Sequence, residues 1–527
     1  MPLTTREELH FLESLSQLIY SNPFLPERIE LEKATLGKEF DESAPVWSQH
    51  FQVDGERANV VALGRRVVPL ADRLRESLSA GQAASDRELA LYEDLVVYLL
   101  YDRYREQLRQ VILAGSSTNG PPRKIDFWPA FRSDFDHYLQ LPGRKLPAAY
   151  EPVHLFACLF QIRRAFQYIY HFILGRSMPA ARLRAAVWQS IFTRDMQRYR
   201  RAMFEKMGDI STLIVGPSGT GKELVARAVG LSRYIPFDPK SQQFTDDFEA
   251  LFHPLNLSAL SPTLIESELF GHRKGSFTGA ISDRIGWLEL CRPLGTVFLD
   301  EVGEVDASIQ VKLLRVMQSR IFQRLGDTAD LQFQGKIIAA TNRDLAVAMR
   351  AGKFREDFYY RLCSDVIRTP SLREQLADLP EDLNHLVSHL AGRIAGDEAP
   401  ALAEEVVGWV QSSLAPGYSW PGNIRELEQC VRSVLVRGKY EPAGAPPDPS
   451  LGNPRTQLAS EFAAGRLPAE DILNRYCTIV YASSRSLEQA ARELGLDRRT
   501  VKGRIDHDLL ARLTGENQRR DDRAGES

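Results

Sequence analysis

The chain has 527 residues, 43% of them hydrophobic, and a formal net charge of −3. This length allows about three domains with real cores, and the charge excludes a protein that attracts nucleic acid over its whole surface, so any DNA contact needs a local basic patch. The five cysteines, Cys158, Cys291, Cys363, Cys430 and Cys477, are scattered without metal-site spacing and are interpreted as reduced thiols of a cytoplasmic protein.

The amino terminus reads M-P-L-T-T-R-E-E-L-H, which has early acids and lacks the apolar core of a signal peptide. The most apolar stretch, residues 155–174, is interrupted by polar and basic side chains that a lipid-facing span would not tolerate. We therefore expect a soluble protein with no membrane partner.

Residues 1–174 are predicted to form a mainly helical regulatory domain. Apolar residues recur at three- and four-residue spacing in 89–111, and residues 152–174 form a second candidate helix. Alternating strands are scarce, which argues against a receiver domain and against a sheet-rich sensor domain. We expect this region to respond to an unknown ligand or protein partner, and no family resemblance is found in it.

Strand and helix patterns alternate from residue 211 onward, as in a parallel sheet covered by helices. The predicted elements are a strand at 211–215, a helix at 223–229, and strands at 296–299 and 336–340. We assign an α/β ATPase core to residues 175–370 and a helical lid to residues 371–437.

A phosphate-binding loop follows the first of these strands. It consists of Gly216, Pro217, Ser218, Gly219, Thr220, Gly221 and Lys222. Glycines let the backbone N–H groups surround the phosphates of ATP at a helix start, and the lysine neutralises the outer phosphates. The next residue, Glu223, stands where the generic motif has a Ser or Thr ligand for Mg²⁺.

An acidic pair, Asp300 and Glu301, ends the apolar strand at 296–299. An aspartate there can hold hydrated Mg²⁺, and a glutamate can orient water on the γ-phosphate. Paired surface carboxylates are usually only solvated, but the position after a buried strand and downstream of a phosphate loop favours catalysis.

Residues 266–280 read E-S-E-L-F-G-H-R-K-G-S-F-T-G-A. The last six, Gly275, Ser276, Phe277, Thr278, Gly279 and Ala280, combine small residues with one aromatic ring and one hydroxyl, which allows a sharp turn with a compact tip. A glycine-rich turn without function is the alternative for an isolated motif, but this run lies between two halves of an ATPase site.

The 266–280 run closely resembles the GAFTGA loop of the sigma-54 activators, bacterial enhancer-binding AAA+ proteins that remodel RNA polymerase carrying sigma-54, with Ser276 where the family usually has alanine. The resemblance extends from G-R-S-M-P-A-A-R-L-R at Gly175 to Arg437, and the family also carries G-T-G-K-E in its phosphate loop. The link before the first strand is lengthened here by residues 193–207. The resemblance implies contact of residues 275–280 with sigma-54.

The resemblance implies further roles inside one subunit. Asn256, in N-L-S-A-L, matches a switch asparagine that tethers the catalytic glutamate. Thr341 and Asn342, in A-A-T-N-R, match the first sensor.

It also implies residues that act during assembly and closure. Arg355 and Arg361, in F-R-E-D-F-Y-Y-R, match the pair that reaches into a neighbouring subunit, so a ring, most simply a hexamer, is expected. Arg425, in W-P-G-N-I-R-E-L, matches the second sensor on the lid and is counted with the ATP-binding residues.

The carboxyl-terminal part is predicted to be a linker (438–468, Pro- and Gly-containing at 441–454), a helix-turn-helix domain (469–515) and a disordered tail (516–527). In 487–505, Ala491 is expected where two helices cross, Gly495 at the turn, and Val501 with Ile505 as anchors. This segment resembles the Fis-type domain of the same family.

Residues 485–504 carry six basic and three acidic side chains, which is a local positive patch. The residues expected to contact double-stranded DNA are Arg498, Arg499, Thr500 and Lys502. A three-helix domain with solvated charges is the alternative for such a motif alone.

Together these features predict a transcriptional activator that binds upstream DNA, forms a ring and spends ATP to remodel sigma-54 RNA polymerase. Two alternatives stay open: a DNA-binding repressor whose motor is uncoupled from sigma-54, and an AAA+ remodeller of another protein. The intact 275–280 loop argues against the first.

Overall fold

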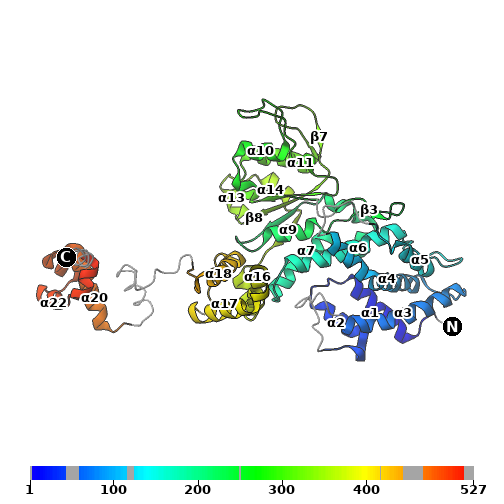
Figure 1. The fold of residues 1–527 in the computed structure, drawn as a ribbon, viewed down its shortest axis with the longest axis horizontal. Coiled ribbons are helices and arrows are strands. Elements are labelled where there is room, and N and C mark those ends of the chain that lie inside the picture. The colour runs from blue at the N-terminus through cyan, green and yellow to red at the C-terminus, as the bar shows by residue number, and fades with distance from the viewer. Residues whose placement is uncertain are drawn as a thin grey trace. The chain divides into compact units, whose positions relative to one another are not determined.

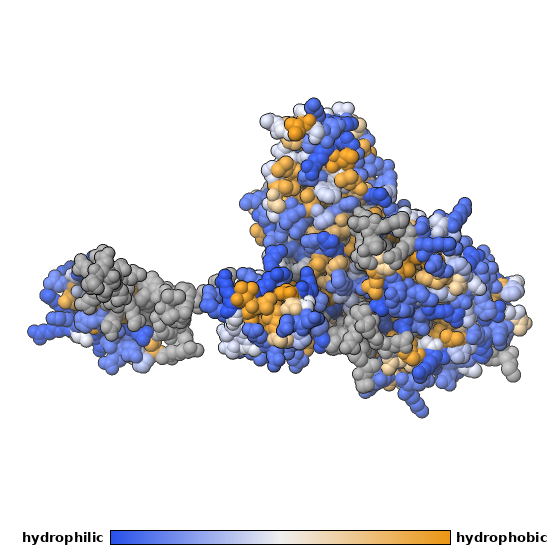
Figure 2. Space-filling view, viewed as in Figure 1, coloured by the Kyte–Doolittle hydropathy of each residue, from blue (hydrophilic) through white to orange (hydrophobic). Residues whose placement is uncertain are grey.

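The computed structural model describes residues 3–42, 58–115, 124–247, 251–415, 417–442 and 467–514 (Figure 1). The chain divides into two compact units, residues 1–438 and 439–527. No helix within the described ranges is long and apolar enough to cross a bilayer. The surface in Figure 2 is largely hydrophilic, with separate apolar groups.

The amino-terminal region is helical, as its residue spacing predicts. Its helices are α1 (Arg6–Tyr20), α2 (Glu27–Leu36), α3 (Ala58–Ser79), α4 (Asp86–Gly115), α5 (Trp128–Leu139) and α6 (Pro152–Phe172), with a 3₁₀ turn η1 (Gly37–Glu39). Helix α1 begins with a capping box, in which Thr5 and Glu8 each accept from the other's backbone N–H. The longest helix, α4, is buried along most of its length.

The segment between α6 and the sheet is also helical. It consists of α7 (Met178–Phe192), α8 (Met196–Arg198), a π-turn η2 (Tyr199–Met203) and a 3₁₀ turn η3 (Lys206–Gly208). The lengthened link at 193–207 therefore forms short helical turns that lead directly into the first strand.

The core of the first unit is a parallel five-stranded sheet in the order β4-β5-β8-β1-β9. Its strands are β4 (Phe252–Asn256), β5 (Thr296–Asp300), β8 (Lys336–Thr341), β1 (Thr212–Val215) and β9 (Asp365–Arg368). This confirms the prediction of an α/β fold with a parallel sheet.

Helices and short hairpins connect these strands. They are α9 (Lys222–Gly230), α10 (Pro262–Phe270), α11 (Trp287–Leu290), α12 (Ala307–Ser319), α13 (Leu345–Arg350) and α14 (Glu356–Leu362), with β2 (Phe237–Asp238) paired to β3 (Gln243–Phe244) and β6 (Ile321–Phe322) to β7 (Leu331–Gln332). Two 3₁₀ turns, η4 (Leu257–Ala259) and η5 (Val302–Glu304), follow β4 and β5.

The two faces of the sheet bury side chains in two different cores. Along β1, Leu213 belongs to the core shared with α10, α12 and α14, whereas Ile214 belongs to the core on the other face. This alternation is the period of two that a strand covered on both faces requires.

The core that contains Ile214 is continuous with the amino-terminal helices. It joins residues such as Leu15, Leu95 and Phe156 to Val225 and Phe298. Helix α6 packs against both α9 and β2. No break between compact units therefore occurs at the proposed boundary of residue 174.

The lid consists of α15 (Leu372–Asp378), α16 (Asp382–Ala395), η6 (Gly396–Glu398), α17 (Ala399–Ser413) and α18 (Asn423–Arg437). Two carboxylates hold the G-R-S-M motif to it: Asp382 accepts from the backbone N–H of Arg176 at 2.8 Å, and Asp378 from that of Met178 at 2.7 Å. Figure 2 shows apolar residues gathered on the lid surface, and Val436 of α18 is 76% exposed.

The second unit contains α20 (Ala469–Ser484), α21 (Leu487–Leu494), α22 (Arg498–Gly503) and α23 (His507–Thr514). Gly495 adopts φ 63° between α21 and α22, as a tight turn requires. The prediction for Ala491 is wrong, since the fully buried small residue of α21 is Ala490. Val501 is buried as expected, whereas Ile505 is half-buried. Residues 443–466 of the proposed linker and the tail at 516–527 lie outside the described residues.

Candidate functional site

The predicted site residues meet at the carboxyl ends of three neighbouring strands. The phosphate loop follows β1, Thr341 ends β8, and Asp300 ends β5. Thr341 is the register partner of Val215, the residue before the loop, and β8 lies between β1 and β5. The carboxyl edge of a parallel sheet is where α/β proteins bind ligands.

Close packing fixes the shape of the phosphate loop. A Cβ at Gly216 would lie 2.1 Å from Oγ1 of Thr369, and one at Gly219 would lie 2.2 Å from the carbonyl oxygen of Gly422. Glycine is therefore required at both positions. Helix α9 begins directly after the loop without a side-chain cap, so its first N–H groups are available to an anion.

Lys222 points back into this loop. Its Nζ donates to the carbonyl oxygens of Gly216 and Pro217, each at 3.2 Å. Burial lowers the pKa of Lys222, against the opposing attraction of Glu301 and Asp300. The ammonium group of Lys222 is therefore close enough to both carboxylates to be attracted by them.

The acidic pair has two different environments. Burial, followed by the neighbouring charge of Glu301, raises the pKa of Asp300. Glu301 has φ 56°, a left-handed backbone that is costly for a residue with a Cβ. This conformation places its Oε2 3.2 Å from the backbone nitrogen of Asn342, which donates to it. The first sensor segment therefore holds the carboxylate predicted to orient water.

Asn256 lies beside this pair but does not hold Glu301. It is the register partner of Asp300, and its Oδ1 accepts from the backbone nitrogen of Ser258 at 3.0 Å, which caps η4. The tether that the resemblance implies is thus replaced in this structure by the bond from Asn342. The carboxylate of Glu223, the residue after the loop, pairs with Arg227 at 2.8 Å.

The lid reaches the phosphate loop through α18. Arg425 Nη1 lies 3.5 Å from Oγ of Ser218, while Asn423 Nδ2 donates to the carbonyl oxygen of Ser218 at 2.9 Å. Asn423 Oδ1 also accepts from the backbone nitrogen of Leu372. Asn423 was not singled out from the sequence, although it lies in the W-P-G-N-I-R-E-L motif.

Thr369 is a second residue that sequence reasoning missed. It follows β9, it is fully buried, and its Oγ1 lies 2.7 Å from Oγ1 of Thr220 in the phosphate loop. No local pattern marks this threonine, because its role depends on the pairing of β9 with β1.

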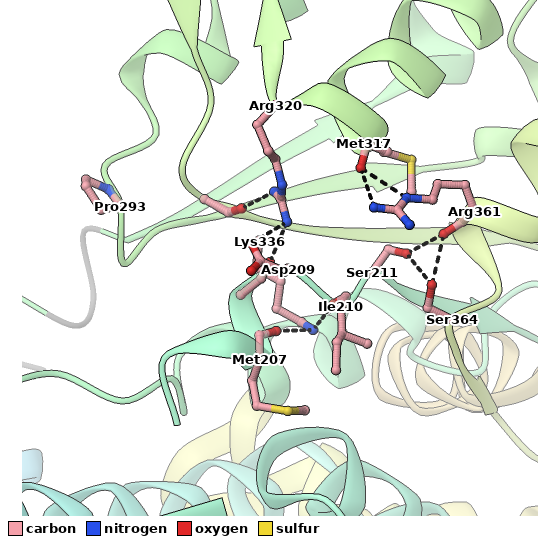
Figure 3. A network of polar contacts seen from close by, with 12 residues as sticks. Met207, Asp209, Ile210, Ser211, Pro293, Met317, Arg320, Lys336, Arg361 and Ser364 are labelled. Carbon is pink, nitrogen blue, oxygen red and sulfur yellow. Dashed lines mark hydrogen bonds and ion pairs between the residues drawn. The ribbon is translucent and has the colours of Figure 1, made fainter. Parts of the chain in front are cut away.

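The two arginines predicted to act across a subunit boundary bind groups of their own chain. Arg355 pairs with Asp357 at 2.7 Å. The Nε and Nη2 atoms of Arg361 donate to the carbonyl oxygen of Met317, at 3.0 and 2.8 Å. The carbonyl oxygen of Arg361 in turn accepts from Oγ of Ser211 at 2.6 Å. Figure 3 shows this connection between α14 and the residue that precedes β1.

Buried Lys336 lies in the same network (Figure 3). Its Nζ donates to the carbonyl oxygens of Ile210 at 2.6 Å and Met207 at 3.4 Å. Arg320 donates to Asp209 and to the carbonyl oxygen of Gly335. Lys336 and Arg320 therefore connect the residues just before β1 to the start of β8 and to the end of α12.

The 275–280 loop follows α10, and ion pairs hold the residues on either side of it together. Arg273 pairs with Asp283 at 2.7 Å and with Asp327 at 2.8 Å. The loop closes through a bond from the backbone nitrogen of Gly275 to the carbonyl oxygen of Ala280 at 2.8 Å. Gly275 and Gly279 adopt φ 83° and 101°, so glycine is favoured at both turns.

Within the loop the side chains differ in exposure. Thr278 and Gly279 are exposed, Phe277 and Ser276 are half-buried, and Ala280 is buried. Phe277 packs edge-on against His272, with ring centroids 5.0 Å apart. Thr278 is thus the most accessible side chain of this tip.

Comparison with known families identifies this region. The family described as the Sigma-54 interaction domain matches residues 190–368. This confirms the resemblance drawn from the 266–280 run. The match includes the phosphate loop, the acidic pair, the two residues predicted to form the first sensor, and Arg361. Arg425, predicted to be the second sensor, lies beyond it.

Curated relatives support the same assignment. The chain is 44% identical over 227 residues to the Nif-specific regulatory protein of Azotobacter vinelandii, covering 43% of this chain and 40% of that one. It is 36% identical over 304 residues to the transcriptional regulatory protein ZraR of Salmonella typhimurium, covering 56% and 63%. The chain therefore spans less than two thirds of the length of each of these relatives.

Among solved structures, NtrX from Brucella abortus aligns over 73% of this chain and 79% of its own, with 21% identity and a TM-score of 0.39.

The four residues proposed for DNA contact lie outside the matched residues 190–368, on α22. Arg498, Arg499 and Lys502 are exposed. Thr500 is half-buried, and its hydroxyl donates to Asp497, which caps the helix through the backbone N–H of Arg499 and Thr500. Thr500 thus helps to form the start of α22, whereas the three cations are accessible.

Proposed function

We propose that this protein is a sigma-54-dependent transcriptional activator of the cytoplasm, which binds upstream DNA, assembles into a ring and uses ATP hydrolysis to remodel sigma-54 RNA polymerase. The observation that carries the proposal is that one domain contains both the G-S-F-T-G-A loop, with Thr278 exposed, and the residues predicted to bind and hydrolyse ATP. The signal that controls the motor enters through residues 1–174.

The phosphate loop and the start of α9 fit the phosphates of ATP. The N–H groups at the helix start provide donors, and Lys222 exchanges its two carbonyl partners for phosphate oxygens. Asp300 would be the protein's contribution to a Mg²⁺ bound mainly by phosphate and water. The ion would neutralise charge that develops on the phosphates.

Glu301 would orient the attacking water, and its backbone conformation together with the bond from the N–H of Asn342 supports this role. Arg355 and Arg361 would complete the site of a neighbouring subunit and stabilise transition-state charge there. For this to occur, Arg361 must leave the carbonyl oxygen of Met317. The apolar residues on the lid surface provide area for contact between subunits.

The 275–280 loop would carry the motion to sigma-54, with Thr278 at the accessible tip and Phe277 released from His272. The exposed cations of α22 would hold the protein on DNA upstream of the promoter, where Arg and Lys neutralise phosphates.

The decisive experiment compares Thr278→Ala with the unaltered protein in promoter opening by sigma-54 polymerase. The substitution removes one exposed hydroxyl and leaves the nucleotide site intact, so ATP hydrolysis is expected within about twofold of normal while opening is lost. Thr328→Ala, on the neighbouring 323–330 loop, serves as the matched control. Full opening by Thr278→Ala would contradict the role of the tip.

Hydrolysis in trans is tested separately with mixed rings. Glu301→Gln and Arg361→Ala chains should each be inactive, with hydrolysis reduced by roughly 10²-fold or more. Mixing them should restore activity at interfaces that pair an intact glutamate with an intact arginine. Absence of recovery in verified mixed rings would contradict action across the boundary.

A repressor with an uncoupled motor would hydrolyse ATP normally yet never open a promoter. A remodeller of another protein would show hydrolysis that is insensitive to sigma-54. The same promoter assay, run with and without sigma-54, separates these alternatives.

A further inference from the structure

A cavity lies among the amino-terminal helices of the first unit. It has a volume of about 550 Å³ and is lined mainly by α4 and α6, with further residues from α1, α2, α3, α7 and the link before β1. This volume falls within the range of about 300–1,000 Å³ that is typical of small-molecule sites. Figure 1 shows these helices side by side.

Two helical stripes form the facing walls. On α4 the lining residues include Tyr98, Tyr101 and Arg105, and on α6 they include Ile162 and Phe166. Spacings of three and four residues place each set on one face of its helix. The cavity is therefore built by the regular packing of two helices.

Aromatic side chains give the cavity flat, apolar surfaces. Phe166 lies 4.9 Å from Trp188 of α7 between ring centroids. Both rings, together with Tyr170, surround the fully buried Phe24 at 5.3 to 5.9 Å. A ligand with an aromatic body could stack on or pack edge-to-face against Phe166, Tyr170 and Trp188.

The lining has more cations than anions. Five arginines contribute to it, whereas Asp102 and Glu106 are the acids. Two of the arginines are paired within the wall, Arg105 with Asp102 at 3.3 Å and Arg109 with Glu106 at 2.9 Å, and Arg28 pairs with Glu32 at 2.7 Å. Arg163 and Arg200 also contribute positive charge to the lining.

Arg200 lies in η2, within the link at 193–207 that leads into β1, and its side chain is buried. One of its Nη atoms donates to the hydroxyls of Tyr20 and Tyr150, each at 2.6 Å, while its buried Nε has no hydrogen-bond partner among the described residues. A buried guanidinium gains from a nearby anion. The lining therefore favours a ligand that carries an acidic group.

The same walls touch the motor on their other side. Phe160 of α6 stacks on Phe244 with centroids 3.9 Å apart, and Gln161 donates to the carbonyl oxygen of Ser232, just after α9, at 2.9 Å. Arg200 lies in η2, which leads into β1. Thus α6 and η2 connect the cavity to the two elements that flank the phosphate loop.

We propose that this cavity binds a small anion with an aromatic body and that its occupancy is transmitted to the phosphate loop through α6 and η2. The binding part stands on the cavity itself, whereas the transmission part rests on the proposed ATPase function. A ligand can change the motor only by binding its two packing states with different affinity.

The test uses two probes with the same ring system, 1-anilinonaphthalene-8-sulfonate and the uncharged N-phenyl-1-naphthylamine, with the full-length protein. The sulfonate is expected to bind at one site, at least about tenfold more tightly than the neutral probe. Energy transfer from tryptophan to the bound sulfonate should fall in Trp188→Phe, because Trp188 lies in the wall.

Two substitutions locate the anion. Arg200→Gln and Arg163→Gln should each weaken sulfonate binding about tenfold and leave binding of the neutral probe unchanged. Arg103→Gln is the matched control, because Arg103 lies on α4 but pairs with Asp134 outside the cavity. Equal affinity for both probes, or an equal loss in Arg103→Gln, would overturn the binding proposal.

Transmission is measured as the ATP hydrolysis rate with and without saturating sulfonate. A change of at least about twofold is expected, and it should be lost in Arg163→Gln. Binding without any change in the rate would overturn transmission alone. A protein that binds the probe but hydrolyses no ATP would instead contradict the proposed function.

Discussion

At the scale of single residues, Ser276 is an unusual position in the 275–280 loop. Its hydroxyl oxygen is buried and has no hydrogen-bond partner among the described residues, and its Cβ faces Gly326, where an added Cβ would lie 2.7 Å away. A buried hydroxyl without a partner costs about 1–3 kcal/mol. This serine occupies the place where the sigma-54 activators usually have alanine.

We therefore predict that Ser276→Ala stabilises the loop by about 1 kcal/mol, because it removes the buried hydroxyl without opening a cavity. Hydrogen exchange of the backbone amides at 273–281 should become slower. Thr278→Ala is the control, since Thr278 is exposed and its replacement relieves no such cost. Faster exchange in Ser276→Ala would show that the hydroxyl has a partner in solution.

Lys336 is the second informative residue. Burial lowers its pKa to about 7, partly offset by the attraction of Asp365. Between pH 7 and the ordinary lysine pKa of 10.5, the unfolded chain binds more protons than the folded chain. The contribution of Lys336 to the free energy of unfolding therefore rises with pH in this window.

Accordingly, the difference in free energy of unfolding between the unaltered protein and Lys336→Met, measured by denaturant unfolding, should increase from pH 7 to pH 9, by up to about 1.4 kcal/mol per pH unit. The loss of two hydrogen bonds in Lys336→Met adds a cost that does not depend on pH. Lys353→Met, an exposed site, should show no such increase. A constant difference would mean that Lys336 keeps an ordinary pKa.

At the scale of elements, the contact between the lid and the phosphate loop depends on the start of α18. Asn423 has φ 53°, which suits asparagine better than most residues, and its amide joins Ser218 to Leu372. The neighbouring Arg425 makes a weaker contact. Closure of the lid therefore depends on backbone geometry as well as on the predicted sensor arginine.

Asn423→Ala should weaken ATP binding about tenfold or more. It removes two hydrogen bonds, and alanine is less stable than asparagine in a backbone conformation with positive φ. Titration with a fluorescent ATP analogue measures this. Asn423→Gly separates the causes, since glycine tolerates the backbone and restores only the part due to strain. Unchanged binding in Asn423→Ala would contradict the coupling.

At the scale of the whole molecule, the amino-terminal helices and the sheet bury one continuous core. Phe156 and Phe160 pack on Phe237 and Phe244, with centroids 3.9 to 6.0 Å apart. Each buried phenylalanine contributes about 1.5–3 kcal/mol. The amino-terminal region is thus part of the folded motor as well as a candidate regulator of it.

We predict that a chain beginning at Gly175 aggregates or unfolds at a lower temperature than the full chain, because these rings become exposed. Light scattering and thermal unfolding measure this. Removal of residues 439–527, which form a separate compact unit, is the control and should leave the main transition unchanged. A stable, monodisperse Gly175 chain would show that the shared core is dispensable, and would then allow restraint of the motor to be measured.

The sequence predicted the α/β core and the helical amino-terminal region, because strand and helix periodicity are local patterns. The residues it proposed for the nucleotide site meet at the carboxyl edge of the sheet, and the 266–280 run predicted the similarity to the Sigma-54 interaction domain family. Sequence reasoning missed Thr369 and Asn423, and misplaced the buried alanine of α21, because these depend on which segments pack together.

Only the tertiary structure decided how the amino-terminal helices join the motor. The stripes of α4 and α6 are visible in the sequence as helical periodicity, but the same periodicity fits any buried helix. Whether the facing surfaces of α4 and α6 pack without a gap or leave a cavity depends on side-chain volumes. It also depends on how closely α7 and the π-turn η2 approach them. The same holds for Glu301, whose identity the sequence provides, but whose orientation comes from its left-handed backbone and the neighbouring strand β8.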